Sequence, residues 1–180
     1  MDLRAPWRRN RHERAGFLLY GRAVAAARDP LLYTALGVPD TLHGRFDLVG
    51  LHAFLLIRRL RRLPPPGPDL AQAVFDAMFS DMDVNLREMG VGDLSVCKRV
   101  RTMWEAFHGR AHAYDAAMDA ADPAALEQAL IRNVWRGQAA PGAAALARLA
   151  FAQARHLEAQ DLPSVAAGRA DFLPAAAALQ

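Results

Sequence analysis

The sequence predicts an all-α, single-domain, irregular helical bundle of about six helices. Three observations support this fold class. Apolar residues recur at spacings of three and four over several long segments, which is typical of helices with one buried face. Proline, glycine and Asp-Pro signals separate those segments, and no segment alternates apolar and polar residues as a half-buried strand would. A chain of 180 residues is long enough to bury a sizeable core.

The boundaries of the expected helices come from start and stop signals. Pro30 and the run PPPGP prevent continuation of the helices that precede them, and Gly37 and Gly90 can take the left-handed conformation that often follows a helix end. Asp122 and the proline after it form a typical helix start. The expected helices span residues 12–29, 31–36, 41–63, 69–89, 93–121 and 122–137, with one more within 138–163. The Ala-rich residues 164–180 are expected to be loosely held.

The second long helix, which Asp40 or Thr41 would cap, is apolar on two faces. One stripe is expected to be core: Leu42, Phe46, Val49, Ala53, Ile57 and Leu60. Leu48, Leu51 and Leu55 form a second stripe on the opposite side. Such a helix is either central in the bundle or keeps one face for a partner. If the second stripe is buried, a covering helix must exist, and the segment Ala143 to Leu157 is the candidate.

The third long helix carries several acids around the stretch FSDMDVNLREMG. Its expected core stripe is Phe75, Met78, Phe79, Met82, Leu86 and Met89. Asp76, Asp83 and Arg87 share one flank, and Asp83 and Arg87 are four apart in the favourable order for an ion pair. Asp81 and Glu88 lie on the other flank. Because the acids are divided between two sides, we expect them, with Asp93, to serve binding and not metal ligation or catalysis.

The sequence holds other side chains that could serve catalysis or metal binding, but their spacing predicts no complete site. Glu105, His108 and His112 share a helical face, but a di-iron bundle needs a second such motif. A helical metal-dependent enzyme using Asp76, Asp83, Glu105 and His112 stays the alternative function. Cys97 is expected to be a buried structural cysteine, and His52 to be hydrogen-bonded within the fold and not a haem ligand. We therefore expect no cofactor and no enzymatic activity.

The net charge of +3 comes almost wholly from arginine. A basic N-terminal tail gathers arginines around Trp7: Arg4, Arg8, Arg9, Arg11 and Arg14. It is either a solvated tail or a contact for anionic lipid or RNA. A membrane- or ribosome-associated adaptor that acts through this tail is therefore a second alternative function. We expect no DNA binding. The most apolar run, residues 48–57, is too short to span a bilayer, so the protein is expected to be soluble, or peripheral at most.

Three stretches, taken together, carry a resemblance to a known family. They are LYTALGVPDTLHGRFDLVGLHAFLLIRRL, AQAVFDAMFSDMDVNLREMGVGDLSVCKRVRTMWEAFHGRAHAY and, more weakly, ALIRNVW. The order VPDT, GRFD, DAMFSDMDVNLREMGVGDLSV and AFHGR resembles the ubiquinol–cytochrome c chaperone family, whose members are assembly factors of the cytochrome bc1 complex. The resemblance covers residues 15–136. It divides the chain into a basic tail (1–14), a family-like helical domain (15–136) and an Ala-rich C-terminal extension (137–180).

The resemblance implies a non-enzymatic role as a chaperone that binds newly made cytochrome b. It also implies a small partner protein, and work on the matrix side of the inner membrane in mitochondria. For a bacterial chain it implies a cytoplasmic protein, peripheral on the cytoplasmic face of the inner membrane. The family pattern maps onto Asp40, Thr41, Gly44, Arg45, Phe46 and Asp47, and onto Asp76, Asp81, Asp83, Leu86, Arg87, Glu88, Gly90, Val91, Gly92 and Asp93. The exposed acids and the second-helix stripe are the expected contacts with the client.

Overall fold

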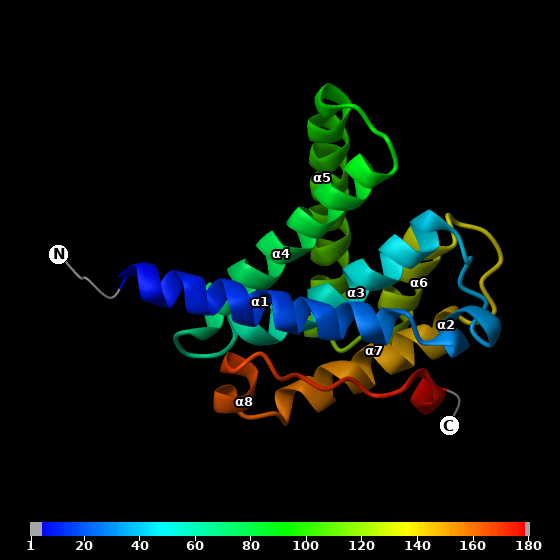
Figure 1. The fold of residues 1–180 in the computed structure, drawn as a ribbon. Helices are drawn as coiled ribbons and strands as arrows, with labels where there is room; N and C mark the ends of the chain where they lie inside the picture. Colours follow the sequence, from blue (N-terminus) through cyan, green and yellow to red (C-terminus); the bar gives the residue numbers. More distant parts are fainter. Residues whose placement is uncertain (1–4, 179–180) are drawn as a thin grey trace.

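The computed structural model describes the backbone of residues 5–178 and, in that range, every side chain except those of residues 5–11, 94 and 178. Within it the chain is all-α, with no strand, which confirms the predicted fold class. Six longer helices form the bundle, as predicted, and two short helices and a 3-10 turn complete it (Figure 1). The helices are α1 (Ala5–Ala27), α2 (Pro30–Thr34), α3 (Leu42–Arg61), α4 (Gly67–Glu88), α5 (Asp93–Asp119), α6 (Pro123–Val134), α7 (Ala143–Glu158) and α8 (Leu162–Ala166), with η1 at Ala175–Ala178.

Side-chain caps fix the starts of several helices where the sequence predicts them. Thr41 accepts a hydrogen bond from the backbone N–H of Gly44 at 3.1 Å and caps α3. Asp122 does the same for α6 through the N–H of Ala125 at 3.0 Å. These oxygens satisfy backbone donors that have no partner inside the helix. The predicted starts of both helices are therefore confirmed.

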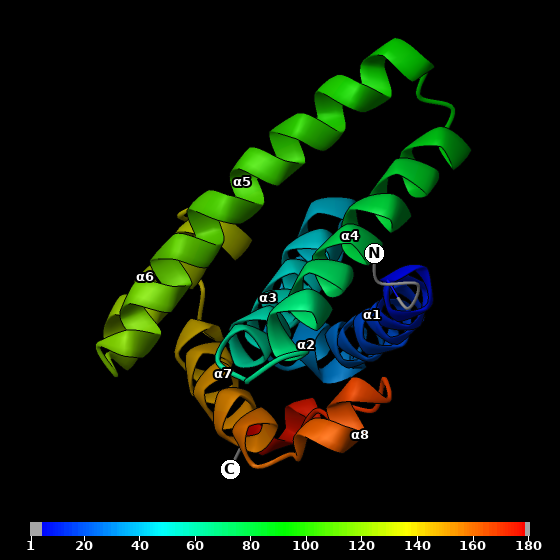
Figure 2. The same cartoon turned by 90° about the vertical axis from the view of Figure 1, so that its left-hand side faces the viewer.

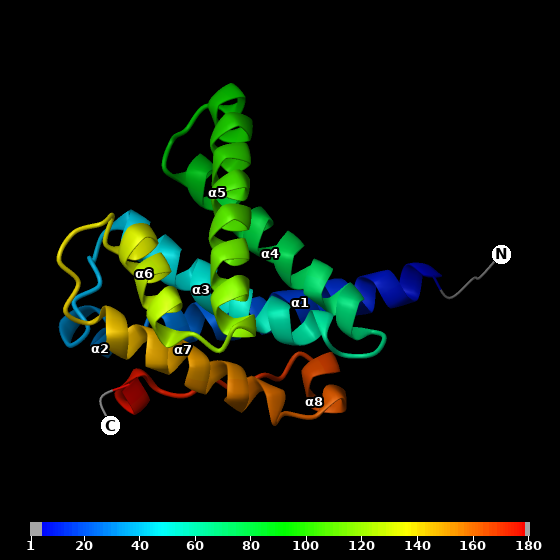
Figure 3. The same ribbon diagram turned by 180° about the vertical axis from the view of Figure 1, so that it is seen from behind.

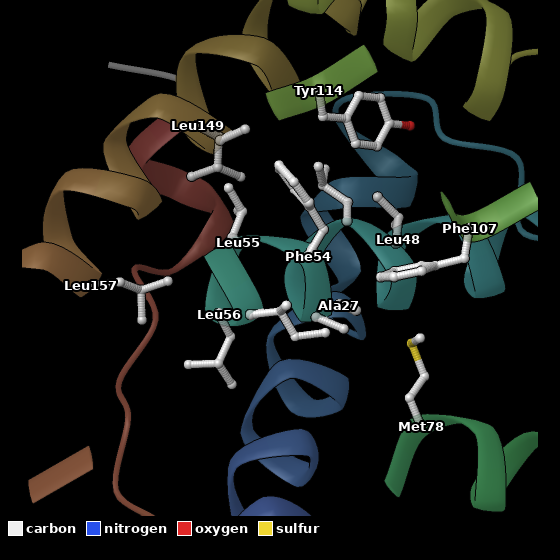
Figure 4. Close-up of a cluster of buried hydrophobic side chains, with 14 of the residues drawn as sticks. Ala27, Leu48, Phe54, Leu55, Leu56, Met78, Phe107, Tyr114, Leu149 and Leu157 are labelled. Atoms are coloured by element: carbon white, nitrogen blue, oxygen red, sulfur yellow. The ribbon is translucent and has the colours of Figure 1, made fainter. Parts of the chain in front are cut away.

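Helix α3 is the centre of the bundle, and α1, α4, α5, α6 and α7 all pack against it. Leu48, Leu51 and Leu55 are each at most 2% exposed. Figure 4 shows Leu48 and Leu55 in one cluster with Phe107 of α5 and Leu149 of α7. The hypothesis that this face of α3 is free for a partner is therefore wrong for this structure, and α7 is the covering helix that burial requires.

The C-terminal segment is tied to the bundle, so the expectation of a loosely held end is wrong up to residue 177. The side-chain amide of Gln153, buried on α7, donates to the carbonyl of Leu173 and accepts from its N–H, both at 2.7 Å. The N–H of Ala175 donates to Asp29 at 2.8 Å, which joins this end to the start of α2. Val165, Ala170 and Ala175 are buried in the same core as α3.

Helices α4 and α5 form an antiparallel hairpin whose far end leaves the bundle. Figures 1 and 2 show the second half of α4 and the first half of α5 projecting beyond the other helices, joined by the short loop after Glu88. Figure 3 shows the same projection from behind. We call residues 75–108 the arm.

Two residues expected in core stripes lie at the surface. Leu42 is 63% exposed because it is the first residue of α3, ahead of the turns that pack. Met89 is 52% exposed because it follows the last turn of α4 at the end of the arm. Among the described residues, no helix is long and apolar enough to cross a bilayer.

Candidate functional site

The base of the arm is stiffened by packed aromatic rings from both helices. Phe75 and Phe79 of α4 lie 4.7 Å apart between ring centroids, and Phe107 of α5 meets them at 5.9 and 6.3 Å. Further out, His108 stacks on Trp104 with 4.2 Å between ring centroids. Edge-to-face and tilted ring pairs of this kind add to the stabilisation from burial alone. The phenylalanine rings therefore join the two helices at the base of the arm, whereas the contact of Trp104 with His108 lies within α5.

The tip of the arm is closed by one arginine between two carboxylates. Arg87 donates from Nε to Asp83 at 2.6 Å and also bonds to Asp93, the first residue of α5. The sequence-predicted pair of Asp83 and Arg87 is confirmed. Gly90 turns the chain between the helices with φ at +79°, in the region that side chains disfavour. Asp83, Arg87 and Asp93 therefore position the loop, although all three remain accessible at the surface.

The other acids of the arm have separate partners. Asp81 accepts a hydrogen bond from the hydroxyl of Tyr20 on α1 at 2.7 Å, and burial together with this carboxylate raises the pKa of Tyr20. Asp76 accepts from the amide of Gln72 at 2.7 Å. Glu88 lies exposed beside the tip. The α4 side of the arm thus presents acids, with Asp81 also joining the arm to the bundle, whereas the α5 side carries the exposed Lys98, Arg99 and Arg101.

Exposed apolar side chains accompany these acids on the arm. Val84 is 49% exposed, Met89 52% and Trp104 45%. Singly exposed apolar residues are common on protein surfaces, so the candidate surface rests on three of them lying on one projecting element. Sequence reasoning missed Val84 and Trp104 and placed Met89 in the core. Val84 falls outside the stripe of methionines and phenylalanines on α4, and this position was the sequence signal that could have predicted its exposure.

The arm does not assemble the metal site considered from the sequence. Glu105 pairs with Arg101 at 3.1 Å, and Asp83 with Arg87. In the part of the chain that the structure describes, no three His, Cys, Asp or Glu side chains converge on one point. The four-residue metal set of the alternative hypothesis is therefore not brought together. Cys97 lies exposed on α5, so the expectation of a buried cysteine is wrong.

A pocket of about 260 Å³ opens at the foot of the arm, between the end of α3 and α5. Apolar side chains and three arginines contribute to its lining. Its lining consists of Phe54, Ile57, Arg58, Arg61, Arg62, Phe107, His108, Ala111, His112 and Asp115. Arg58 is already paired with Asp115 at 2.7 Å and with Asp119 at 2.6 Å, and Arg62 with Asp119 at 2.5 Å. These pairs neutralise most of the charge, and they lower the pKa of Asp119.

Two residues of the family pattern at the start of α3, Asp47 and Gly44, hold the fold. Asp47 is buried, pairs with Arg110 of α5 and lies 2.8 Å from Nη2 of Arg136, off the hydrogen-bond direction. Burial raises the pKa of Asp47, while the two guanidinium groups oppose that change. Gly44 lies against the carbonyl of Pro39, where a Cβ would collide. Trp135 donates from its indole N–H to the carbonyl of Gly37 at 2.9 Å. These contacts tie α5 to the start of α3, and the end of α6 to α3 and the loop before it.

His52 lies in the core of α3, 2% exposed, and its Nδ1–H donates to the carbonyl of Leu48 at 2.8 Å. Burial lowers its pKa. The prediction of a histidine hydrogen-bonded within the fold is confirmed.

The side chains of the basic tail lie mostly outside the described part of the structure. Arg4 precedes the described backbone, and the side chains of Arg8, Arg9 and Arg11 are not described. The backbone from Ala5 onward is part of α1, and Arg14 is exposed on it.

Comparison with known proteins identifies the class of this helical bundle. The family model described as ubiquinol-cytochrome C chaperone matches residues 34–172, which include α3, the arm, α6 and α7. The chain belongs to the ubiquinol–cytochrome c chaperone family. The match extends past residue 136, so it takes in much of the stretch that the resemblance had left to a C-terminal extension.

Two relatives agree with this assignment. The chain is similar to the crystal structure of the Cbp3 homolog from Brucella abortus, with a TM-score of 0.85, 35% identity and 98% coverage of each chain. It is also 26% identical over 101 residues to ubiquinol-cytochrome-c reductase complex assembly factor 1 of Xenopus laevis. That alignment covers 56% of this chain and 50% of the frog protein, so the chain spans about half the length of the curated relative it matches.

Proposed function

We propose that this chain is a non-enzymatic assembly factor that binds newly made cytochrome b during assembly of the ubiquinol–cytochrome c reductase (bc1) complex. Family membership supports the role in assembly. The frog relative is named for the reductase complex that it helps to assemble. The chain acts in the cytoplasm, at the cytoplasmic face of the inner membrane, where cytochrome b is inserted.

The exposed surface of the arm is the observation that supports the proposed binding of cytochrome b. It combines exposed acids with the exposed apolar side chains of Val84, Met89 and Trp104 on a rigid projection. A membrane protein caught during synthesis offers apolar helices and, in its cytoplasmic loops, an excess of lysine and arginine. Apolar contacts framed by carboxylates are complementary to both features. The face of α3 that sequence reasoning favoured is not available, because Leu48, Leu51 and Leu55 are buried.

The test is capture of pulse-labelled cytochrome b by the tagged full-length chain. A second membrane protein of several spans, made in the same cells, serves as the specificity control. The wild-type chain should retain cytochrome b and not the second protein. The triple variant Val84→Ser/Met89→Ser/Trp104→Ser should fold normally, since all three side chains are about half exposed, and lose most of the captured cytochrome b.

A matched control for this variant is Leu42→Ser. Leu42 is 63% exposed at the start of α3, away from the arm, so its loss should leave capture unchanged. Equal retention of both membrane proteins by the wild-type chain would remove the assignment of cytochrome b as client. Full capture by the triple variant would remove the arm as the binding surface.

A further inference from the structure

The outer side of α1 carries a pair of apolar residues that the bundle leaves about half exposed. Phe17 is 54% exposed and Leu18 is 51% exposed, although both belong to a helix whose opposite side is buried at Ala15, Leu19 and Ala23. Figures 1 and 2 show one long side of α1 with no other helix over it. The pair is separate from the arm, and the proposed binding of cytochrome b does not require it.

Arginines surround this pair. Arg14, Leu18 and Arg22 are spaced by four residues, so they lie in one row along the outer side of α1, with Phe17 next to it. Both arginines are exposed. The inner edge of Leu18 rests on the backbone at Gly168, and the next residue, Arg169, is exposed as well. Glu13 is the acid among the described side chains of α1.

The size and charge of this surface favour a lipid over a protein as its occupant. A second copy of the chain would need roughly 800 Å² on each partner for a stable interface, far more than two half-exposed side chains provide. A transmembrane client helix needs a groove with anchors over several turns, whereas these apolar residues are adjacent on a convex helix. A bilayer interface makes no such demand, because apolar side chains enter the acyl boundary while arginines stay among the headgroups.

We propose that α1 docks this protein onto a membrane that contains anionic lipid, with Phe17 and Leu18 entering the interface and Arg14 and Arg22 contacting the headgroups. The sequence toward the N-terminus adds four more arginines, Arg4, Arg8, Arg9 and Arg11, which strengthen the same attraction. The contact is weak and reversible, since two apolar side chains are a small anchor. It holds the chain at the bilayer without a spanning segment.

The test is co-sedimentation of the full-length chain with vesicles of phosphatidylglycerol mixed with phosphatidylcholine, and with vesicles of phosphatidylcholine alone. The wild-type chain should sediment with the anionic vesicles and much less with the neutral ones, and salt should weaken the binding. The variant Phe17→Ser/Leu18→Ser should lower the partition coefficient about ten-fold while its circular dichroism melt stays close to wild type. The variant Arg14→Gln/Arg22→Gln should reduce binding to anionic vesicles toward the neutral level.

The control variant is again Leu42→Ser, which removes an equally exposed leucine from another helix and should leave the partition coefficient unchanged. The proposal is overturned if the wild-type chain does not bind the anionic vesicles, or if Phe17→Ser/Leu18→Ser binds them as well as wild type. Loss of self-association in that variant, with no vesicle binding by wild type, would assign the surface to a second copy instead. None of these measurements uses cytochrome b, so they test membrane docking independently of the proposed function.

Discussion

Helix α3 and the arm both carry many apolar side chains, but those of α3 are mostly buried and several of those on the arm are exposed. Twelve residues of α3, including Asp47 and His52, are buried by the helices around it. The arm has its apolar rings packed at the base but leaves Val84, Met89 and Trp104 about half exposed toward its end. In sequence α3 has the more apolar character of the two, with ten successive residues from Leu48 to Ile57 of which eight are plain hydrophobic side chains.

The difference shows that apolar content does not locate an interaction surface by itself. A helix with two apolar faces is buried when enough other helices reach it, and α7 supplies the last of these for α3. The outer part of the arm extends beyond α1, α6 and α7 (Figures 1 and 2), so a moderate apolar content remains at the surface there. Four measurements test this difference between a buried α3 and an exposed arm.

The largest effect is expected for a charge placed in α3. Leu51→Asp would bury an unpaired carboxylate at a position that is 1% exposed, and we expect a loss of more than about 4 kcal/mol in the free energy of unfolding. Val84→Asp on the arm should cost less than about 1 kcal/mol, since half of that side chain is already in water. Urea denaturation followed by circular dichroism measures both. A Leu51→Asp variant as stable as Val84→Asp would contradict the central position of α3.

The next effect concerns the buried ion pair under the start of α3. Asp47→Ala leaves Arg110 without its carboxylate in a mostly buried position, and we expect a loss of about 3 kcal/mol in the free energy of unfolding. Asp40→Ala removes an ion pair of similar type, with Arg45, from the surface. Its thermal midpoint should stay within error of wild type. Equal midpoints for the two variants would show that Asp47 does not hold the fold.

A smaller effect is expected from the protonation of His52. Burial lowers its pKa in the folded state, whereas the unfolded chain binds a proton at the ordinary value of about 6.5. Stability is therefore fully present above that value and falls with decreasing pH until the folded state also takes up the proton. The slope below about pH 6 should approach 1.4 kcal/mol per pH unit for this one group.

The variant His52→Gln isolates this contribution. It should be less stable than wild type near neutral pH, because glutamine fills the site less well. Its free energy of unfolding should fall less steeply than that of wild type between about pH 7 and pH 5. Parallel curves for the two proteins would mean that His52 is not the titrating group.

Local signals in the sequence predicted the helices well because they act within a few residues. The caps at Thr41 and Asp122 and the ion pair of Asp83 with Arg87 were all predicted from spacing alone. The burial and exposure of several side chains could not be predicted, because they depend on which helices pack against each other. The burial of Leu55 depends on α7, about a hundred residues further along the chain, and Leu48 lies beside Phe107 of α5 (Figure 4). The exposure of Cys97 and Trp104 depends on how far the arm extends past its neighbours.

The same limit applies to the candidate site. The acids around the tip were recognised in sequence, but their roles were not, because Asp81 is held by a tyrosine sixty-one residues away and Asp93 by Arg87 across the loop. Val84 and Trp104 carry no sequence signal of exposure other than a position off the main stripe. The buried pairing of Asp47 with two arginines requires α5 and the end of α6 to arrive together, which spacing within one helix does not encode.

The most direct test of the claim that the arm contacts the client uses the chain's single cysteine. Cys97 is exposed on α5 within the arm, so a thiol-linked photocrosslinker can be attached to the otherwise unaltered protein. The control is Cys97→Ser/Leu42→Cys, which moves the same probe to an exposed position at the start of α3. During cytochrome b synthesis, the probe at position 97 should yield an adduct with cytochrome b, and the probe at position 42 should yield none. An adduct from position 42, with none from position 97, would contradict the account.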